Sequence, residues 1–273
     1  MSGARSRGTI ALISAIPLLL GTSPTRGAGD AAKPLQVFAA ASLSDAFTEL
    51  GRMLEQQHAG LRVRFNFAGS QQLVAQLEQG APADLLASAD ERWMSYAESH
   101  GLVTGEPETF VHNTLVVIVP RANPGRVGKL QDLARGGIKL VLAADAVPAG
   151  RYSRTVLRNL ARTEGFAVDY ATRVQQNVVS EEENVKSVVS KVQLGEADAG
   201  LVYQSDVTPA VSRYVRVLPI PRSANVLASY PMALVKDAPA PDAAKAFMEL
   251  LLSAEGQRIL ERHGLVPLAA NAR

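Results

Sequence analysis

Residues 35–54 read LQVFAAASLSDAFTELGRML, and this stretch decides the fold class. Its first six residues are apolar apart from one glutamine, as in a strand that is buried on both faces of a sheet. Apolar residues then recur at the i, i+3, i+4, i+7 spacing of an amphipathic helix, at Leu43, Ala46, Phe47, Leu50 and Leu54. A strand, a short turn of small and polar residues, and a helix together indicate an α/β protein.

The same alternation continues along the chain. The sequence predicts strands at Leu35–Ala40, Arg62–Phe67, Asp84–Ala87, Leu115–Val119, Ile138–Ala143, Ala199–Tyr203, Val215–Ile220 and Met232–Val235. Apolar residues at helical spacing also predict helices at Val185–Val192, which ends before Gly195, at Ala243–Leu252 and at Ala254–His263. The pattern therefore predicts an α/β architecture from residue 34 onward.

The composition limits the class of protein. Of the 273 residues, 47% are hydrophobic and 20% are charged, which excludes a disordered, collagenous or coiled-coil chain. The chain has no cysteine, which excludes disulfides, thiolate metal sites, a cysteine nucleophile and a lipidated N-terminal cysteine. The formal net charge is only +2, and basic residues do not cluster with aromatic ones, so we expect no nucleic-acid partner.

The N-terminal residues 1–31 have the features of a secretory signal peptide. Arg5 and Arg7 precede an apolar stretch from Thr9 to Leu20, and the small residues Gly27–Gly29 offer a cleavage site. The apolar stretch is shorter than the roughly 20 residues that span a bilayer. We therefore expect a cleaved signal peptide and a periplasmic protein. An N-terminal membrane anchor or a buried helix is the alternative.

One pattern points to a binding site. A strand, a short turn of small or polar residues and a helix follow one another at Ala39–Ser42, Ala68–Ser70, Asp145–Gly150 and Ser180–Val185. In open α/β sheets, ligands bind beyond the carboxyl ends of strands, where helices begin. The first N–H groups of a helix lack intrahelical acceptors and carry the positive end of the helix dipole, so they bind anions. Several such helix starts together would form an anion site from neutral donors.

Each of these candidate residues also has a structural interpretation. Ser42 in the segment Ser42–Asp45 is expected as the N-cap of the first helix, in a capping-box arrangement. Ser70 occupies a position where serine is common simply because a strand turns into a helix. Gly150 could serve only a turn, and Tyr203 is expected as a half-buried aromatic residue at the end of a strand.

Sequence features of enzymes are weak. The four histidines do not have the spacing of metal ligands, and neither a G-x-S-x-G motif nor a Walker-type phosphate loop occurs. We interpret the acidic run Glu181–Glu183 as the solvated first turn of a helix, and Arg151 as a surface residue. A secreted hydrolase that uses Ser42 or Ser70 would need a histidine within hydrogen-bonding reach, for which His112 is the candidate. We expect no enzyme activity, no metal held by side chains and no cofactor.

Five sequence blocks occur in an order that resembles a known family. They are Phe38–Leu43 (FAAASL), Phe67–Ser70 (FAGS), Val147–Tyr152 (VPAGRY), Glu183–Val185 (ENV) and Gly195–Tyr203 (GEADAGLVY). The chain resembles the periplasmic molybdate-binding proteins of ABC transporters from about Leu35 to Pro267. Its last part, Ser253–Pro267, is typical of the wider class of extracellular solute-binding proteins.

The resemblance implies a two-lobed periplasmic-binding-protein fold of type II. Each lobe would be a mixed sheet flanked by helices, and a double crossover would form the hinge. The first lobe would comprise residues 34–113 plus 228–273, and the second lobe residues 114–227. The run Thr114–Pro120 and the stretch Pro221–Pro231 lie where the two crossings are needed.

The resemblance also implies a set of ligand-binding residues. Ser42 and Ser70 would supply hydroxyl and backbone donors, Ala149 and Val185 would supply backbone N–H groups, and Tyr203 would supply its phenol. The ligand would be molybdate or tungstate, with molybdenum bound as an oxyanion. A monomer would deliver it to the membrane permease of an ABC transporter. The run Glu181–Glu183 departs from the family pattern, and a receptor for sulfate or another oxyanion is the alternative.

Overall fold

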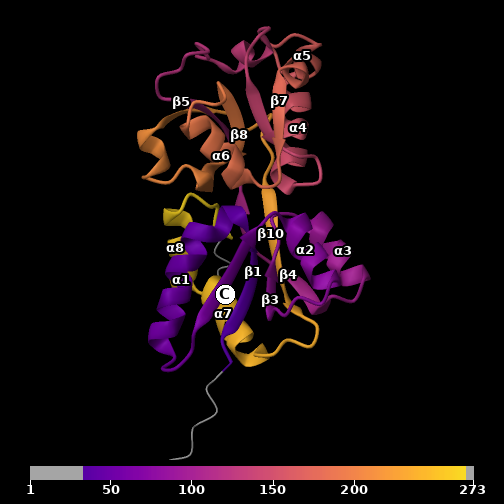
Figure 1. Ribbon diagram of the computed structural model, residues 1–273, viewed down its shortest axis with the longest axis vertical. Coiled ribbons are helices and arrows are strands. Elements are labelled where there is room, and N and C mark those ends of the chain that lie inside the picture. Colours follow the sequence, from indigo (N-terminus) through magenta and orange to yellow (C-terminus); the bar gives the residue numbers. More distant parts are fainter. Residues whose placement is uncertain (1–32, 269–273) are drawn as a thin grey trace, which may run out of the picture. The chain divides into compact units, whose positions relative to one another are not determined.

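The computed structural model describes residues 33–268, which form two five-stranded mixed sheets flanked by helices (Figure 1). The first sheet has the strand order β2 (Val63–Ala68), β1 (Leu35–Ala40), β3 (Leu85–Ala87), β10 (Ala228–Val235) and β4 (Val103–Asn113). The second sheet has the order β7 (Val178–Glu182), β6 (Leu140–Ala143), β8 (Ala199–Tyr203), β5 (Leu115–Pro120) and β9 (Val215–Pro219). The predicted signal peptide, residues 1–31, lies outside the described residues.

The helices are divided between the two sheets. Those of the first sheet are α1 (Ser44–Gln57), α2 (Ser70–Glu78), α3 (Glu91–Ser99), α7 (Pro241–Leu252) and α8 (Ala254–Arg262). Those of the second sheet are α4 (Pro148–Leu160), α5 (Tyr170–Gln176) and α6 (Val185–Gln193). Short 3-10 helices complete the set: η1 (Ala41–Leu43), η2 (Leu130–Ala134), η3 (Gln204–Asp206) and η4 (Val211–Arg213). Within residues 33–268, no helix combines the length and the apolar character that a membrane crossing requires.

The two sheets share one arrangement. In the first, β1 is parallel to β2 and β3, and β10 runs antiparallel between β3 and β4. In the second, β6 is parallel to β7 and β8, and β5 runs antiparallel between β8 and β9. The chain passes from one sheet to the other between β4 and β5 and returns between β9 and β10. The predicted fold class is confirmed. The boundaries of the lobes, 34–113 with 228–273 and 114–227, stay a prediction.

Both faces of the first sheet are covered, which explains the apolar run that opens the described chain. Val37 packs in the main core, whereas its neighbour Phe38 packs in a second cluster with Leu73 and Leu86. Helix α1 packs with α7 and α8 on the main core. Its predicted apolar stripe is buried, with Phe47 and the neighbouring apolar positions almost wholly inaccessible to solvent. A strand buried on both faces needs apolar residues at consecutive positions.

Strands β4 and β7 were not predicted, and both lie at an edge of their sheets. Strand β4 contains Gly105, Glu106 and Pro107, and β7 contains Glu181 and Glu182. The interpretation of the acidic run as the first turn of a helix was therefore wrong. Edge strands carry charges and prolines that discourage pairing with other chains, so they lack the apolar pattern of central strands.

The two stretches predicted at the crossings include parts of strands, as predicted for Leu115–Val119. Leu115–Pro120 is strand β5 of the second sheet, so only Thr114 separates β4 from β5. Strand β10 begins at Ala228, so Pro231 lies inside it, next to an irregularity in the pairing with β4. Proline is tolerated in a sheet at such an irregularity because it has no N–H group to pair. The return crossing thus lies in the predicted stretch Pro221–Pro231, whose last residues belong to β10.

Candidate functional site

A small cavity lies between elements of the two sheets, and all five predicted ligand-binding residues line it. They are joined there by further small or apolar residues and one asparagine, and the full lining is Ala40, Ala41, Ser42, Ala68, Gly69, Ser70, Ala89, Val147, Pro148, Ala149, Asn184, Val185 and Tyr203. The cavity has a volume of about 10 Å³, roughly the room needed for one water molecule. Pockets for organic ligands measure roughly 300–1,000 Å³. The cavity therefore suits one small, compact group.

Helix starts supply backbone donors to this cavity. Ser70 is the first residue of α2, Val185 the first of α6 and Ala149 the second of α4. Pro148 opens α4, where proline fits because that position needs no intrahelical N–H donor. Asn184 caps α6, since its Oδ1 accepts the N–H of Ser187 at 3.1 Å. The first N–H groups of these helices lack intrahelical acceptors and carry positive dipole ends.

The two serines hold their hydroxyls in different ways. Ser42 lies in η1 and makes no capping hydrogen bond, because the N-cap position of α1 is Leu43. The prediction of Ser42 as an N-cap was therefore wrong. Its Oγ lies 2.9 Å from the hydroxyl of Tyr230, and Ser70 Oγ accepts the N–H of Ala89 at 3.0 Å. In the described chain, no histidine hydrogen-bonds either serine, so the pairing that a serine hydrolase needs is not formed there.

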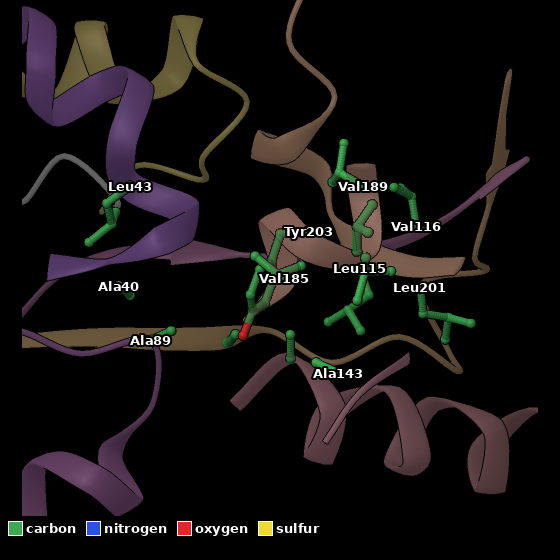
Figure 2. Close-up of a cluster of buried hydrophobic side chains, with 14 of the residues drawn as sticks. Ala40, Leu43, Ala89, Leu115, Val116, Ala143, Val185, Val189, Leu201 and Tyr203 are labelled. Atoms are coloured by element: carbon green, nitrogen blue, oxygen red, sulfur yellow. The ribbon is translucent and has the colours of Figure 1, made fainter. Parts of the chain in front are cut away.

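Tyr203 ends strand β8 and is almost fully buried, with 1% of its surface exposed, where half-burial was expected. Within residues 33–268 its hydroxyl has no hydrogen-bond partner. Figure 2 shows its side chain among buried residues of both sheets, including Ala40 and Leu201. Burial raises the pKa of Tyr203 well above the usual value, so the hydroxyl keeps its proton. An unpaired buried hydroxyl costs about 1–3 kcal/mol, so a hydrogen-bond acceptor in the cavity would stabilise it.

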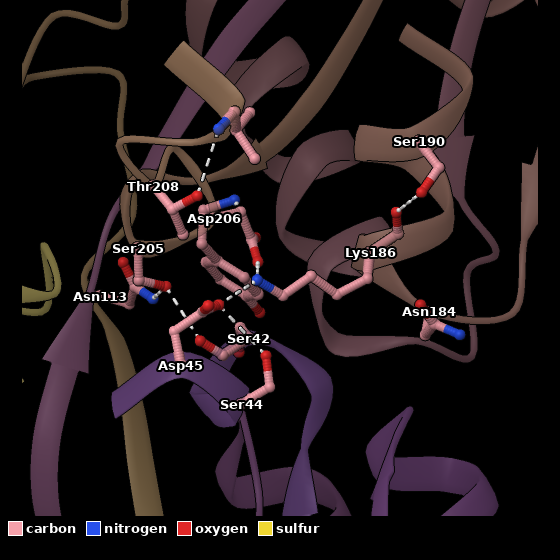
Figure 3. A network of polar contacts seen from close by, with 12 residues as sticks. Ser42, Ser44, Asp45, Asn113, Asn184, Lys186, Ser190, Ser205, Asp206 and Thr208 are labelled. Carbon is pink, nitrogen blue, oxygen red and sulfur yellow. Dashed lines mark hydrogen bonds and ion pairs between the residues drawn. The ribbon is translucent and has the colours of Figure 1, made fainter. Parts of the chain in front are cut away.

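None of the residues that line the cavity is charged, and the charged groups around it are paired. Lys186 Nζ lies 2.8 Å from a carboxylate oxygen of Asp45 and 3.5 Å from one of Asp206 (Figure 3). Arg151 lies 2.7 Å from Asp90, whose side chain is wholly buried. With 33% of its side chain exposed, Arg151 is a partly exposed residue with a buried partner. Sequence spacing does not reveal these pairs, because their members lie far apart along the chain.

Further contacts between elements of the two sheets enclose the cavity. Gln71 and Gln72 at the start of α2 donate their amide N–H groups to the carbonyl and the carboxylate of Glu183, at 2.8 and 3.0 Å. Trp93 Nε1 donates to the carbonyl of Ala146 at 2.7 Å. Sequence analysis did not identify any of these contacts. They show that this structure has the two sides of the cavity in contact.

The remaining acidic residues of the run also have cationic partners. Glu181 pairs with Arg154, and Glu182 lies 2.6 Å from Lys191 Nζ. Their charges are therefore compensated outside the cavity. In the part of the chain that the structure describes, no group of three or more histidine, aspartate or glutamate residues could hold a metal ion. The cavity thus offers serine and tyrosine hydroxyls and helix starts, with no charged side chain among its lining residues.

Comparisons with known proteins agree with this geometry. The family model described as bacterial extracellular solute-binding protein matches residues 35–266. The molybdate-binding protein ModA of Mycobacterium tuberculosis H37Rv is 37% identical over 257 residues, which cover 94% of this chain and 92% of that protein. The molybdate-binding protein ModA of Escherichia coli K12 is 31% identical over 238 residues, which cover 84% of this chain and 88% of that protein.

Solved structures show the same architecture. The periplasmic molybdate-binding protein of Azotobacter vinelandii superposes with a TM-score of 0.74 at 22% identity, covering 86% of this chain and 100% of that one. At this level of identity the match supports the fold, with its two mixed sheets.

Proposed function

Because the chain belongs to the bacterial extracellular solute-binding proteins, we propose that it binds molybdate and delivers it to the permease of an ABC transporter. The observation that carries the proposal is the buried hydroxyl of Tyr203, which lines the cavity and has no partner among the described residues. The relatives named as molybdate-binding proteins cover most of this chain, which supports the choice of ligand.

The donors are sufficient to bind a dianion without a charged side chain. We propose seven: the hydroxyl and N–H of Ser42 and of Ser70, the N–H groups of Ala149 and Val185, and the phenol of Tyr203. Hydrogen bonds to a charged partner contribute roughly 1.5–3 kcal/mol each, so seven contribute about 10–20 kcal/mol before the cost of immobilising the ligand. A micromolar Kd requires only about 8 kcal/mol.

The same donors determine selectivity. Monohydrogen phosphate carries a proton that would face a donor, at a cost of about 1–3 kcal/mol. Sulfate has the charge of molybdate and no proton, but it is a smaller tetrahedron, so only the size of the cavity separates the two. Tungstate matches molybdate in shape, and we expect it to bind comparably.

The proposal includes the setting in which the protein works. Residues 1–31 would be removed as a signal peptide, and a periplasmic monomer would present the bound oxyanion to the permease. The lobes 34–113 with 228–273 and 114–227 would separate to release it. The contacts of Glu183 with Gln71 and Gln72 support this, because exposed hydrogen bonds of this kind open at little cost.

Calorimetric titration of the ligand-stripped protein with molybdate, tungstate, sulfate and phosphate tests the proposal. We expect a micromolar Kd or tighter for molybdate and tungstate, and at least about a hundredfold weaker binding of sulfate and phosphate. Equal affinity for sulfate and molybdate would replace the molybdate assignment with a general oxyanion receptor. Binding of none of the four anions would overturn the proposal as a whole.

A further inference from the structure

A group of buried polar residues lies behind Ser42 and does not line the cavity. It consists of Tyr230 on β10, Asn113 at the end of β4 and Ser205 in η3. The hydroxyl of Tyr230 lies 2.9 Å from Ser42 Oγ and 3.3 Å from Asn113 Nδ2. Figure 3 shows Asn113 and Ser205 beside Ser42. These contacts connect a predicted ligand-binding hydroxyl to residues that sequence analysis did not consider.

The amide of Asn113 determines the direction of the hydrogen bonds in this group. Its Oδ1 accepts the N–H of Thr114 at 2.9 Å, which orients the amide. Its Nδ2 therefore donates to Tyr230 and, at 2.8 Å, to Ser205 Oγ. Because an amide NH₂ group cannot accept, the oxygen of Tyr230 is the acceptor in this contact. Ser205 in turn donates its proton to the carbonyl of Ser42 at 3.3 Å.

Among the described hydrogen-bond contacts, the acceptor for the single proton of Tyr230 is then Ser42 Oγ. Burial raises the pKa of Tyr230 above the usual value, so the hydroxyl is protonated. Tyr230 then donates its proton to Ser42 Oγ, 2.9 Å away. The Ser42 proton is not used in this hydrogen bond and can point into the cavity. The Ser70 oxygen is also an acceptor, because the N–H of Ala89 can only donate to it. Each serine oxygen thus accepts one hydrogen bond from within the protein, and each serine proton is left to donate to a ligand.

We propose that Tyr230, oriented by Asn113, is a positioning residue that keeps Ser42 a hydrogen-bond donor and thereby makes the site select oxyanions without a proton. The inference rests on the proposed function, because it concerns the selectivity of that same cavity. A monohydrogen oxyanion needs an acceptor for its proton, whereas Ser42, held by Tyr230, directs its own proton toward the ligand. The selectivity of the site thus depends on a residue outside the cavity.

The variant Tyr230→Phe tests this inference. Sulfate and monohydrogen phosphate are probes of similar size and equal charge that differ by one proton, and both are measured by competition with molybdate on the full, ligand-stripped chain. In the variant Ser42 is no longer held as a donor, so its hydroxyl can rotate and offer a lone pair to the phosphate proton. We expect the preference for sulfate over phosphate to fall about tenfold and the Kd for molybdate to rise several-fold. An unchanged preference would overturn the inference.

Two controls separate positioning from packing. In a Ser42→Ala background, Tyr230→Phe should change the Kd for molybdate by less than about twofold, because the residue through which it acts is gone. An equal loss of affinity in both backgrounds would identify Tyr230 as a packing residue. Tyr170→Phe is the matched control: Tyr170 is also buried, and its hydroxyl donates to the Leu130 carbonyl at 2.7 Å. It should lower Tm and leave the preference unchanged.

Asn113→Asp provides the test if Tyr230→Phe does not fold. An ionised carboxylate can only accept, so the Tyr230 proton would turn toward it and away from Ser42. The added negative charge weakens the binding of sulfate and of monohydrogen phosphate equally. A change in the preference for sulfate therefore reports only the changed direction of the Tyr230 hydrogen bond. This preference should fall as in Tyr230→Phe. A wild-type protein that binds molybdate, with an unchanged preference in the folded variants, would overturn this inference alone. A wild-type protein that does not bind molybdate would overturn the proposed function.

Discussion

The two sides of the cavity differ in their side-chain donors, although we propose backbone N–H donors on both. On the side of the first sheet, Ser42 and Ser70 contribute side-chain hydroxyls at the ends of β1 and β2. On the side of the second sheet, Ala149 and Val185 have apolar side chains, so their donors are the N–H groups at the starts of α4 and α6. The hydroxyl donors of Ser42 and Ser70 thus depend on the identity of the residue. The N–H donors of Ala149 and Val185 depend on where a helix begins. Substitutions should therefore affect the two sides in different ways.

The largest effect is expected from Gly150→Ala, which acts on the backbone side. A Cβ atom at Gly150 would overlap the carbonyl oxygens of Ala143 and Ala144, so the start of α4 must move. We expect the Kd for molybdate to rise about a hundredfold, at the upper end of the effect of losing one hydrogen bond to the anion, that of the Ala149 N–H. The free energy of unfolding should fall by about 1–3 kcal/mol. Calorimetry and denaturant titration measure the two quantities.

Gly136→Ala is the matched control, because a Cβ atom there meets no other atom within 4 Å. It should leave both the Kd and the free energy of unfolding unchanged. A Gly150→Ala protein with wild-type affinity would show that the start of α4 does not bind the ligand.

On the hydroxyl side, Ser42→Ala and Ser70→Ala should each raise the Kd for molybdate more than about tenfold, because each removes one charge-assisted hydrogen bond. Ser70→Ala also leaves the buried N–H of Ala89 unpaired, so it should lower the free energy of unfolding by about 1–3 kcal/mol. Ser190→Ala, at an exposed position of α6, should change neither quantity. Lower stability with unchanged affinity would assign that serine a structural role only.

Tyr203 joins the two kinds of donor, since it is a side-chain donor on the second-sheet side. Tyr203→Phe should raise the Kd for molybdate about tenfold. The Tm of the free protein should not fall, because the hydroxyl has no partner to lose among the described residues. The increase in Tm on adding molybdate should shrink, since it follows affinity through mass action. Full affinity, or a lower Tm without ligand, would contradict a ligand-binding role.

The smallest effect concerns the ion pairs that connect the two sides. Lys186 follows Val185 on the second-sheet side and pairs with Asp45 on the first-sheet side and with the buried Asp206. Burial raises the pKa of Asp206 to about 6, although the charge of Lys186 opposes this. The native state therefore binds this proton more tightly than the unfolded chain. The contribution of Asp206 to stability is greatest below about pH 4 and is lost as the pH rises through about 6.

Asp206→Asn tests this sign, because asparagine keeps an oxygen for the N–H of Tyr203, which Asp206 accepts at 3.0 Å. The Tm of the wild type minus that of the variant should increase by a few degrees as the pH falls from 7 to 4. Parallel Tm profiles across this range would show that Asp206 does not titrate there.

The positions of the site residues could be predicted from local sequence, whereas their contacts with distant residues could not. Ser42, Ser70, Ala149, Val185 and Tyr203 each lie where a strand ends or a helix begins, and local spacing in the sequence marks such positions. The structure brings all five to one cavity. Only the capping role predicted for Ser42 was wrong, and its partner Tyr230 is 188 residues away along the chain. Local spacing carries no information about a contact of that separation.

The sequence by itself determined the α/β class, the described strands apart from β4 and β7, and the helices α1, α6, α7 and α8, because a strand or helix buried in a core must repeat apolar residues at its own period. Tertiary structure alone decided the edge strands β4 and β7, where the charges and prolines of a sheet edge hide that period. It also decided the pairs Arg151–Asp90 and Lys186–Asp45, and the orientation of Ser42 by Tyr230. Hydrogen bonds and ion pairs form between whichever groups the packed core brings within about 3 Å, and that depends on the whole fold.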